Sequence, residues 1–163
     1  MKKVELTQPR DWKSKKVNVP LKLQRIVMEV FGGCNYTCKM CPQSDPGRGK
    51  HFSRKMPLKT FEEVLDKVVP KYGKPTINLE GSGEPTMAKD LPKYIEAVKS
   101  RGLKAFMYCN GSRLNGKFME DVIDSGIDFV RFSLIGYNKE KYSKWMNIDN
   151  FELIKSNIKE TIK

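Results

Sequence analysis

Three cysteines lie close together in the segment Cys34-Asn-Tyr-Thr-Cys38-Lys-Met-Cys41. Thiolates are ligands for soft metals and for iron–sulfur clusters. A structural zinc site closes its tetrahedron with four ligands, and an iron–sulfur cubane is usually held by four cysteines. Three cysteines would leave one iron open to another molecule, so this spacing indicates an open and reactive metal centre.

A zinc site is the rival interpretation of the same cysteines, with His51 as a fourth ligand. Zinc modules usually bring their ligands in two short-spaced pairs, and a lone histidine in a polar loop does not form such a pair. We therefore interpret His51 as a solvated loop residue. Cys109 lies apart from the other three, so we expect it to be a buried free thiol, with ligation of a second cluster as the weaker alternative.

The elements that must position the cysteines alternate between strands and helices. Runs rich in β-branched and aromatic residues predict strands at 25–31, 76–80, 105–109 and 128–133. Apolar periodicity and end signals predict helices from Thr60 to Pro70, at 91–101, between Asn115 and Gly126, and from 151 to the end of the chain. The first of these begins with a capping-box pair, Thr60 and Glu63. Strands alternating with helices predict right-handed βαβ units and a parallel sheet.

Unusual residues follow the carboxyl end of each predicted strand, where parallel sheets bind their ligands. The four segments are Gly32-Gly33-Cys34, Gly81-Ser82-Gly83-Glu84-Pro85, Asn110-Gly111, and Ser133 with Gly136. Glycines at such positions let the backbone approach a bulky ligand closely. The sequence therefore predicts a ligand site at this edge of the sheet.

Polar residues also alternate with apolar ones inside the predicted strands. They are Glu29, Asn78, Glu80, Arg131 and Ser133. A parallel strand covered on both faces should be almost continuously apolar, so one face of this sheet is expected to line a polar cavity. We take Glu29, Asn78, Glu80 and Arg131 as candidates for substrate contact. The alternative is an ion pair between Arg131 and a carboxylate that fills a barrel.

The chain is basic, with 31 Lys and Arg against 19 Asp and Glu and a net charge of +12. Residues 1–24 hold seven basic and two acidic side chains, and residues 39–59 hold six basic and one acidic. An apolar fraction of 39% is that of a folded protein. Charged residues interrupt every apolar stretch and no signal peptide is evident, so we expect a reducing, cytoplasmic protein without a membrane segment.

The motifs together resemble those of the radical SAM enzymes. The C-x3-C-x2-C spacing resembles the signature of this family, and Gly83-Glu84-Pro85 resembles its glycine-glutamate motif after the second strand. Asn110-Gly111 and the segment 131–136 resemble the segments after the third strand and along the fourth. The matches follow the family's order over residues 25–160.

This resemblance implies a [4Fe–4S] cluster held by Cys34, Cys38 and Cys41, and S-adenosylmethionine bound to the fourth iron. Reductive cleavage would yield a 5′-deoxyadenosyl radical that abstracts hydrogen from an unidentified substrate. The cofactor contacts implied are Met40, Gly81, Ser82, Gly83, Glu84, Asn110 and Ser133. Among these, Glu84 and the Gly83 backbone would hold the methionine amino group, Ser133 would reach the ribose or carboxylate, and Met40 would pack near the adenine.

The resemblance also implies a fold: an α/β partial barrel of about four parallel strands with flanking helices. A closed eight-stranded barrel typically needs roughly 250 residues, and this chain has 163. Family barrels usually have six βα units. We therefore expect residues 25–163 to be the N-terminal two-thirds of such a barrel, stopping after the fourth unit, behind a basic N-terminal extension at 1–24.

The basic segment 39–59 begins inside the cysteine motif, so its charge would lie beside the cluster. It suits an acidic electron donor, such as flavodoxin or ferredoxin, or an anionic substrate. The alternative function is a non-catalytic iron–sulfur or zinc module that binds nucleic acid or a redox partner. Nucleic acid is not favoured, because the basic residues avoid the regular elements and no known zinc-finger spacing is met.

Overall fold

A parallel four-stranded sheet forms the centre of the protein. The computed structural model describes residues 23–45 and 54–162, and its strands are β1 (Arg25–Val27), β2 (Thr76–Asn78), β3 (Lys104–Cys109) and β4 (Phe129–Phe132). The strand order is β1-β2-β3-β4. The register pairs Ile26 with Ile77 and Ile77 with Ala105. All carboxyl ends therefore lie at one edge, as the alternation of strands and helices predicts.

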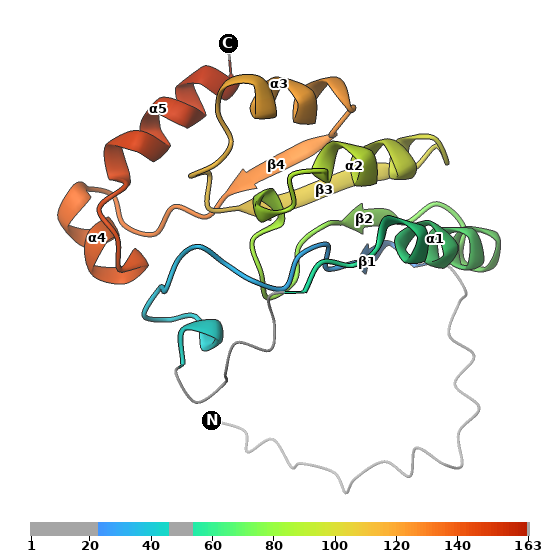
Figure 1. The fold of residues 1–163 in the computed structure, drawn as a ribbon, viewed down its shortest axis with the longest axis horizontal. Coiled ribbons are helices and arrows are strands. Elements are labelled where there is room, and N and C mark those ends of the chain that lie inside the picture. Colours follow the sequence, from blue (N-terminus) through green and yellow to red (C-terminus); the bar gives the residue numbers. More distant parts are fainter. Residues whose placement is uncertain (1–22, 46–53, 163) are drawn as a thin grey trace, which may run out of the picture.

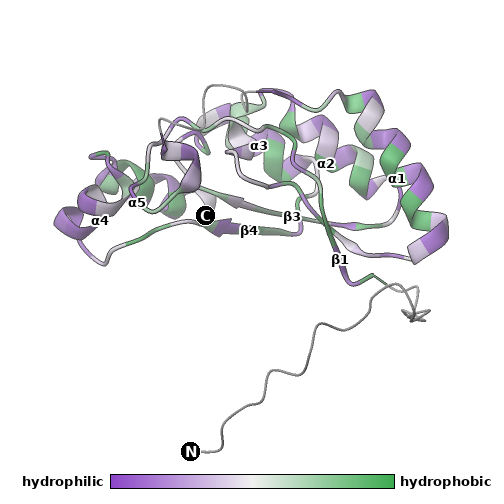
Figure 2. Ribbon diagram, turned by 90° about the horizontal axis from the view of Figure 1, so that it is seen from below, coloured by the Kyte–Doolittle hydropathy of each residue, from purple (hydrophilic) through white to green (hydrophobic). Residues whose placement is uncertain are grey.

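Helices cover one face of this sheet. The helices α1 (Leu58–Tyr72), α2 (Leu91–Lys99) and α3 (Gly116–Asp124) lie together on that face, and the described residues place no helix on the other (Figure 2). Two further helices, α4 (Lys139–Met146) and α5 (Phe151–Thr161), follow β4, and α5 extends toward α3 (Figure 1). Short 3-10 helices occur at η1 (Pro42–Ser44) and η4 (Pro85–Met87). The expected class, an α/β partial barrel with four parallel strands, is confirmed.

The main core lies between the sheet and helices α1 to α3. Its members are Met28, Val30, Phe61, Leu65, Ile77, Leu79, Ala88, Leu91, Tyr94, Ile95, Ala97, Val98, Leu103, Ala105, Met107, Cys109, Leu114, Met119 and Val122. The predicted alternation is confirmed in and just after β2, where Ile77 and Leu79 belong to this core. Burial of this many apolar side chains is the dominant favourable contribution to folding.

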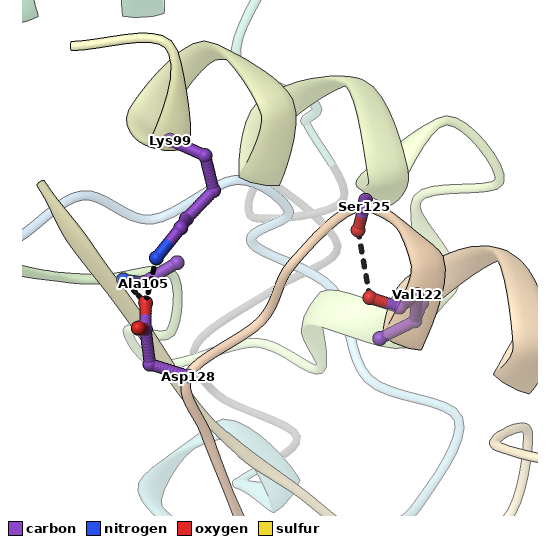
Figure 3. A network of polar contacts seen from close by, with 5 residues as sticks. All are labelled: Lys99, Ala105, Val122, Ser125 and Asp128. Atoms are coloured by element: carbon purple, nitrogen blue, oxygen red, sulfur yellow. Dashed lines mark hydrogen bonds and ion pairs between the residues drawn. The ribbon is translucent and has the colours of Figure 1, made fainter. Parts of the chain in front are cut away.

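Polar contacts at the opposite end of the sheet from the cysteines tie the helices to the strands. Figure 3 shows the Asp128 carboxylate, which pairs with Lys99 of α2 at 2.6 Å and accepts the Ala105 amide of β3 at 2.8 Å. Nearby, Ser125 donates its hydroxyl to the Val122 carbonyl at 2.7 Å and so satisfies the end of α3. Asp128 thus fixes the start of β4 against α2 and β3.

The first two strands are shorter than predicted. Met28 still donates its amide to the Asn78 carbonyl at 2.8 Å. The chain then pairs with the segment before α1, where Phe31 and Lys55 form an antiparallel bridge and Gly32 donates to the Arg54 carbonyl at 2.9 Å. Strand β2 ends at Asn78 because the chain then turns into its glycine loop. The elements that carry the functional loops therefore leave the sheet earlier than β propensity suggests.

Helix α1 differs from its prediction at both ends. It begins at Leu58 after Pro57, so Thr60 lies inside the helix and the capping box is wrong. It also continues past Pro70 to Tyr72, because the exposed Pro70 removes only one backbone hydrogen bond in the last turns. Gly73, at φ 82°, ends it. Helix α2 ends at Lys99, two residues before its predicted end.

Helix α4 was absent from the sequence prediction. Its N-cap residue Asn138 accepts the Lys141 amide at 2.9 Å, which is the expected cap geometry. The helix is mostly polar and buries only Tyr142 and Met146, so its periodicity is weak. Among the described residues, none of the helices is both long enough and apolar enough to cross a membrane.

Candidate functional site

The cysteine loop follows β1 at the carboxyl edge of the sheet. Cys34 is exposed, whereas Cys38 and Cys41 are half-buried, and the Cys41 amide donates to the Cys38 carbonyl at 2.9 Å. No three His, Cys, Asp or Glu side chains of the described segments are gathered closely enough to hold a single metal ion. A [4Fe–4S] cubane does not need the three thiolates to meet at one ion, because each thiolate binds a different iron. His51 and Lys50 lie outside the described residues.

The thiols influence one another electrostatically. Partial desolvation of the sulfur by the surrounding loops raises the pKa of Cys34 although the residue is exposed, and the nearby Cys41 adds to that rise, whereas a hydrogen bond from the Tyr36 amide opposes it. Burial and the charges of the other two thiols likewise raise the pKa of Cys38. Thiolates that repel one another are costly without a cation, so binding of a metal centre would release the thiol protons and remove this repulsion.

A second hydrophobic cluster includes Tyr36 of the cysteine loop and packs against Cys38. We call it the tyrosine cluster: Tyr36, Tyr142, Met146 and Ile154, with Cys38, Ile148, Phe151 and Ile158 packed against it. The Tyr36 hydroxyl receives hydrogen bonds from Tyr142 at 3.2 Å and Asn150 at 2.9 Å. Burial and the Tyr36 hydroxyl raise the pKa of Tyr142, so this phenol stays protonated and donates.

Helix α4 adds direct contacts to the same loop. The Trp145 carbonyl accepts the Lys39 amide at 2.9 Å, and Asn147 donates to the Thr37 hydroxyl at 3.0 Å. The Cys38 and Met146 sulfurs lie 3.8 Å apart. The C-terminal part of the cysteine motif, from Tyr36 to Lys39, is therefore fixed by residues more than 100 positions away.

The glycine loop after β2 packs directly on the start of the cysteine loop. The Glu84 amide donates to the Gly33 carbonyl at 2.8 Å. A Cβ atom at Gly83 would lie 2.6 Å from the Gly32 carbonyl carbon and 2.7 Å from the Gly33 oxygen, so only glycine fits there. This close approach joins the cysteine motif to the Gly83-Glu84-Pro85 motif.

Two carboxylates hold the glycine loop. Glu29 accepts the Ser82 and Gly83 amides, the latter at 3.0 Å. Glu84 is 3% exposed and accepts the Asn110 amide at 2.7 Å and the Thr86 hydroxyl at 2.6 Å. Burial raises the pKa of Glu84, and these hydrogen bonds oppose the rise. Both carboxylates thus bind backbone amides of the loops at the site.

The turn after β3 completes this group of loops. Asn110 is 5% exposed, and its amide nitrogen donates to the Asn35 side-chain oxygen at 2.9 Å and approaches the Cys34 sulfur at 3.9 Å. Its oxygen accepts the Ser112 amide at 2.9 Å. Gly111, at φ 75°, presents its carbonyl to the buried Asn157 of α5 at 2.8 Å. Loops after β1, β2 and β3 are therefore linked by hydrogen bonds.

The helix-free face of the sheet carries the polar strand residues. Asn78 donates to Glu80 at 2.6 Å, and Glu80 accepts the Tyr108 amide at 3.3 Å. Arg131 lies over the Tyr108 ring at 5.4 Å and donates to its hydroxyl at 3.2 Å. The alternative of an Arg131–carboxylate ion pair is wrong for the part of the chain that the structure describes, since no carboxylate there pairs with it.

The remaining predicted residues lie around the same edge. Met40 is 41% exposed beside Cys41, and Ser133 donates its amide to the Cys109 carbonyl at 2.8 Å. Cys109 is a buried free thiol, as expected. In the basic segment, Arg54 is exposed and Lys55 pairs with Asp90 at 2.7 Å.

Several residues that shape the site were not predicted from the sequence. They are Asn35, Tyr36, Ser112, Tyr142, Met146 and Asn157. Asn35 and Ser112 join loops that are 77 positions apart, so no local periodicity marks them. A weak signal exists for α4, because Tyr142, Trp145 and Met146 follow the i, i+3, i+4 spacing of an amphipathic helix.

Comparison with known proteins gives one consistent family. A sequence profile described as the radical SAM superfamily matches residues 28–163. A probable GTP 3′,8-cyclase of Thermococcus kodakarensis is 30% identical over 132 residues, which cover 80% of this chain and 41% of the relative. A protein of Methanocaldococcus jannaschii without an assigned function is 28% identical over 137 residues, covering 81% and 41%. The chain thus spans about two-fifths of the length of these relatives.

A solved structure agrees at the level of the fold. The crystal structure of BtrN in complex with AdoMet and 2-DOIA superposes with a TM-score of 0.58 at 24% identity. The match covers 71% of this chain and 48% of BtrN. The sheet that carries the loops after β1, β2 and β3 therefore shares its fold with BtrN.

Proposed function

The chain belongs to the radical SAM superfamily, and we propose that its cysteine loop and glycine loop together bind the two cofactors of that family, a [4Fe–4S] cluster and S-adenosylmethionine. When bound, these cofactors supply a 5′-deoxyadenosyl radical, which abstracts hydrogen from a substrate. The observation that carries the proposal is the direct packing of the Gly83 backbone on Gly32 and Gly33, immediately before the first cysteine.

Cys34, Cys38 and Cys41 are the proposed cluster ligands. They lie in one loop, they interact electrostatically, and Cys34 remains exposed. The donor set suits a cluster, because three thiolates satisfy three irons and leave the fourth open. The tyrosine cluster restrains the loop before any metal is bound, which reduces the entropy that binding must overcome.

The glycine loop is the proposed S-adenosylmethionine site, with Gly81, Ser82, Gly83 and Glu84 beside the cluster and Met40 and Ser133 at its margins. Glu29 orients the loop by accepting two of its amides. The Asn78 side-chain oxygen is buried and has no hydrogen-bond partner among the described residues. An unpaired buried acceptor costs about 1–3 kcal/mol, so it supports a polar ligand that donates to this oxygen.

Substrate contact is proposed for Glu80 and Arg131, with Asn78 and Glu29 at the edge nearest the glycine loop. Arg131 is exposed on the helix-free face, where Phe129 is also 55% exposed. A charged and aromatic face of this kind suits an anionic or planar substrate. We further propose a cytoplasmic protein that receives electrons from an acidic donor such as flavodoxin or ferredoxin, beside Lys39 and Arg54.

Anaerobic reconstitution with iron and sulfide tests the proposal. The wild-type chain should take up about four irons, bind S-adenosylmethionine in a calorimetric titration, and form 5′-deoxyadenosine when reduced. Cys38→Ala should lose the cluster, whereas Cys109→Ala, a matched change outside the loop, should keep it. Uptake of zinc alone would contradict the proposal, and a cluster that binds no S-adenosylmethionine would favour a non-catalytic iron–sulfur module.

A further inference from the structure

One cysteine of the loop has more hydrogen-bond donors around it than the others. The Cys34 sulfur is approached by the Tyr36 amide at 3.4 Å and by the Asn110 side-chain nitrogen at 3.9 Å. Within the described segments, neither Cys38 nor Cys41 accepts a hydrogen bond from another side chain. The environment of the three thiols is therefore asymmetric.

The orientation of the Asn110 amide group follows from its partners. Its oxygen faces the Ser112 backbone amide at 2.9 Å, and a backbone N–H can only donate. The nitrogen must then face Asn35 and Cys34, with one hydrogen for the Asn35 oxygen at 2.9 Å and the other for the sulfur. Asn35 in turn donates to the Ser112 hydroxyl at 2.9 Å, so the arrangement forms a closed ring.

The backbone of Asn110 is fixed as firmly as its side chain. Its amide donates to the buried Glu84 carboxylate at 2.7 Å, and the next carbonyl, that of Gly111, accepts from Asn157 of α5. Asn110 itself is 5% exposed. Water therefore competes little for its hydrogen bonds, which makes each of them stronger than at the surface.

We propose that Asn110 is a positioning residue that raises the reduction potential of the cluster through its N–H donor to Cys34. The inference rests on the proposed function, since it requires a cluster on Cys34. Reduction adds one electron from an external donor and increases the negative charge on the sulfurs. A donor aimed at one sulfur stabilises the reduced state more than the oxidised state, so hydrogen bonds to ligand sulfurs raise the potential.

This role differs from the cofactor contact that the Asn-Gly motif implies for Asn110. All polar atoms of its side chain are already engaged by Asn35, Ser112 and Cys34. The side chain of Asn110 thus contacts the cysteine loop, whereas Glu29 binds the glycine loop and Glu84 binds the Asn110 backbone amide.

The test is a dye-mediated redox titration of the reconstituted full chain, followed by electron paramagnetic resonance without S-adenosylmethionine. At a fixed potential, Asn110→Leu should lower the ratio of reduced to oxidised cluster about threefold, which corresponds to about 30 mV for one electron. Asn110→Asp should lower it further, because it replaces a donor with a negative charge. Asn35→Ala is the matched control, since it removes one ring partner and leaves the donor to Cys34.

An unchanged ratio in Asn110→Leu would overturn the inference, and so would an equal shift in Asn35→Ala, which would point to loop order rather than the hydrogen bond. If Asn110→Leu takes up no iron, Asn110→Ser replaces it in the redox titration. The serine side chain is too short for its hydroxyl to reach the Cys34 sulfur. Loss of iron in both variants with an intact far-ultraviolet circular dichroism spectrum would assign Asn110 to cluster retention and overturn tuning. A wild-type chain that takes up no cluster contradicts the proposed function itself.

Discussion

The main core and the tyrosine cluster differ in what their side chains do besides packing. The main core is apolar and lies between the sheet and α1 to α3, remote from solvent. The tyrosine cluster is small and includes two hydroxyl groups and a cysteine of the cysteine loop. The chain therefore uses one region for stability and another for shaping its site, and each region can be disrupted separately.

Phe61→Ala should have the largest effect on stability. Phe61 is fully buried in the main core and packs edge-on against Tyr94, with ring centroids 5.1 Å apart. Removing a buried aromatic ring costs about 3–5 kcal/mol, against a total of roughly 5–15 kcal/mol for a domain. Urea unfolding of the metal-free chain measures it. Ile123→Ala, at a half-exposed apolar site on α3, should cost far less; equal losses would contradict a single dominant core.

Ile154→Ala tests the tyrosine cluster, where we expect the next largest loss. The side chain is fully buried between α5 and the cysteine loop, and its truncation should cost about 2–4 kcal/mol. Hydrogen exchange should show loss of protection in α4 and α5 while β2 and β3 stay protected, and the reconstituted chain should hold less iron.

Leu153→Ala changes the neighbouring, exposed side chain of the same helix and should leave both measurements unaltered. If Ile154→Ala instead reduced protection uniformly across the sheet, the two regions would form one cooperative unit and the comparison would fail.

Gly83→Ala probes the junction between the glycine loop and the cysteine loop. The added methyl group meets backbone atoms of Gly32 and Gly33, which cannot rotate away, so the loops must separate. Forcing such a contact typically costs about 1–3 kcal/mol. Affinity for S-adenosylmethionine, measured by calorimetry, should fall together with stability. Ser82→Ala keeps the amide that Glu29 accepts and adds no atoms at the junction, so it should leave stability unchanged.

The buried Glu84 should give a smaller effect that depends on pH. Burial raises the pKa of Glu84 above that of the unfolded chain, so the folded state binds more protons between the two values. The free energy of unfolding should therefore fall as pH rises through the folded pKa, and this part of the pH dependence should disappear in Glu84→Gln. Urea titrations from pH 4 to pH 7 measure the difference.

Glu63→Gln, an exposed carboxylate of α1, is the control and should reproduce the wild-type slope. A Glu84→Gln chain with the wild-type slope would show that the carboxylate is charged throughout, held by the amide of Asn110 and the hydroxyl of Thr86.

The sequence predicted the main core better than the tyrosine cluster, and the reason is physical. Strand β3 and helices α2, α3 and α5 show simple apolar periodicities, which can be recognised from a few residues of the sequence. Helix α4 carries only a short apolar stripe among lysines, and its stability comes from contacts with the cysteine loop. Tertiary contacts of this kind leave no periodic trace.

The site divides in the same way. The cysteines and glycines were predictable because their types are unusual and their spacing is local. Asn35, Ser112 and Asn157 are ordinary polar residues, and only the sheet topology brings them together around Asn110 and Gly111. The early end of β1 was missed for the same reason, since the chain from Val30 to Gly32 pairs with 54–56 rather than with β2.

The rates at which the cysteines react compare the main core with the tyrosine cluster directly, because each region contains a cysteine. Cys109 belongs to the main core at 2% exposure, and burial raises the pKa of its thiol strongly. Iodoacetamide should modify Cys34, Cys38 and Cys41 of the metal-free chain, while Cys109 must wait for the core to open and reacts orders of magnitude more slowly. Peptide mass spectrometry at several times, with and without urea, measures this. Ile154→Ala should speed labelling of Cys38 but not of Cys109, whereas Phe61→Ala should speed labelling of Cys109. If both variants exposed Cys109 equally, the stability of the sheet would depend on the tyrosine cluster after all.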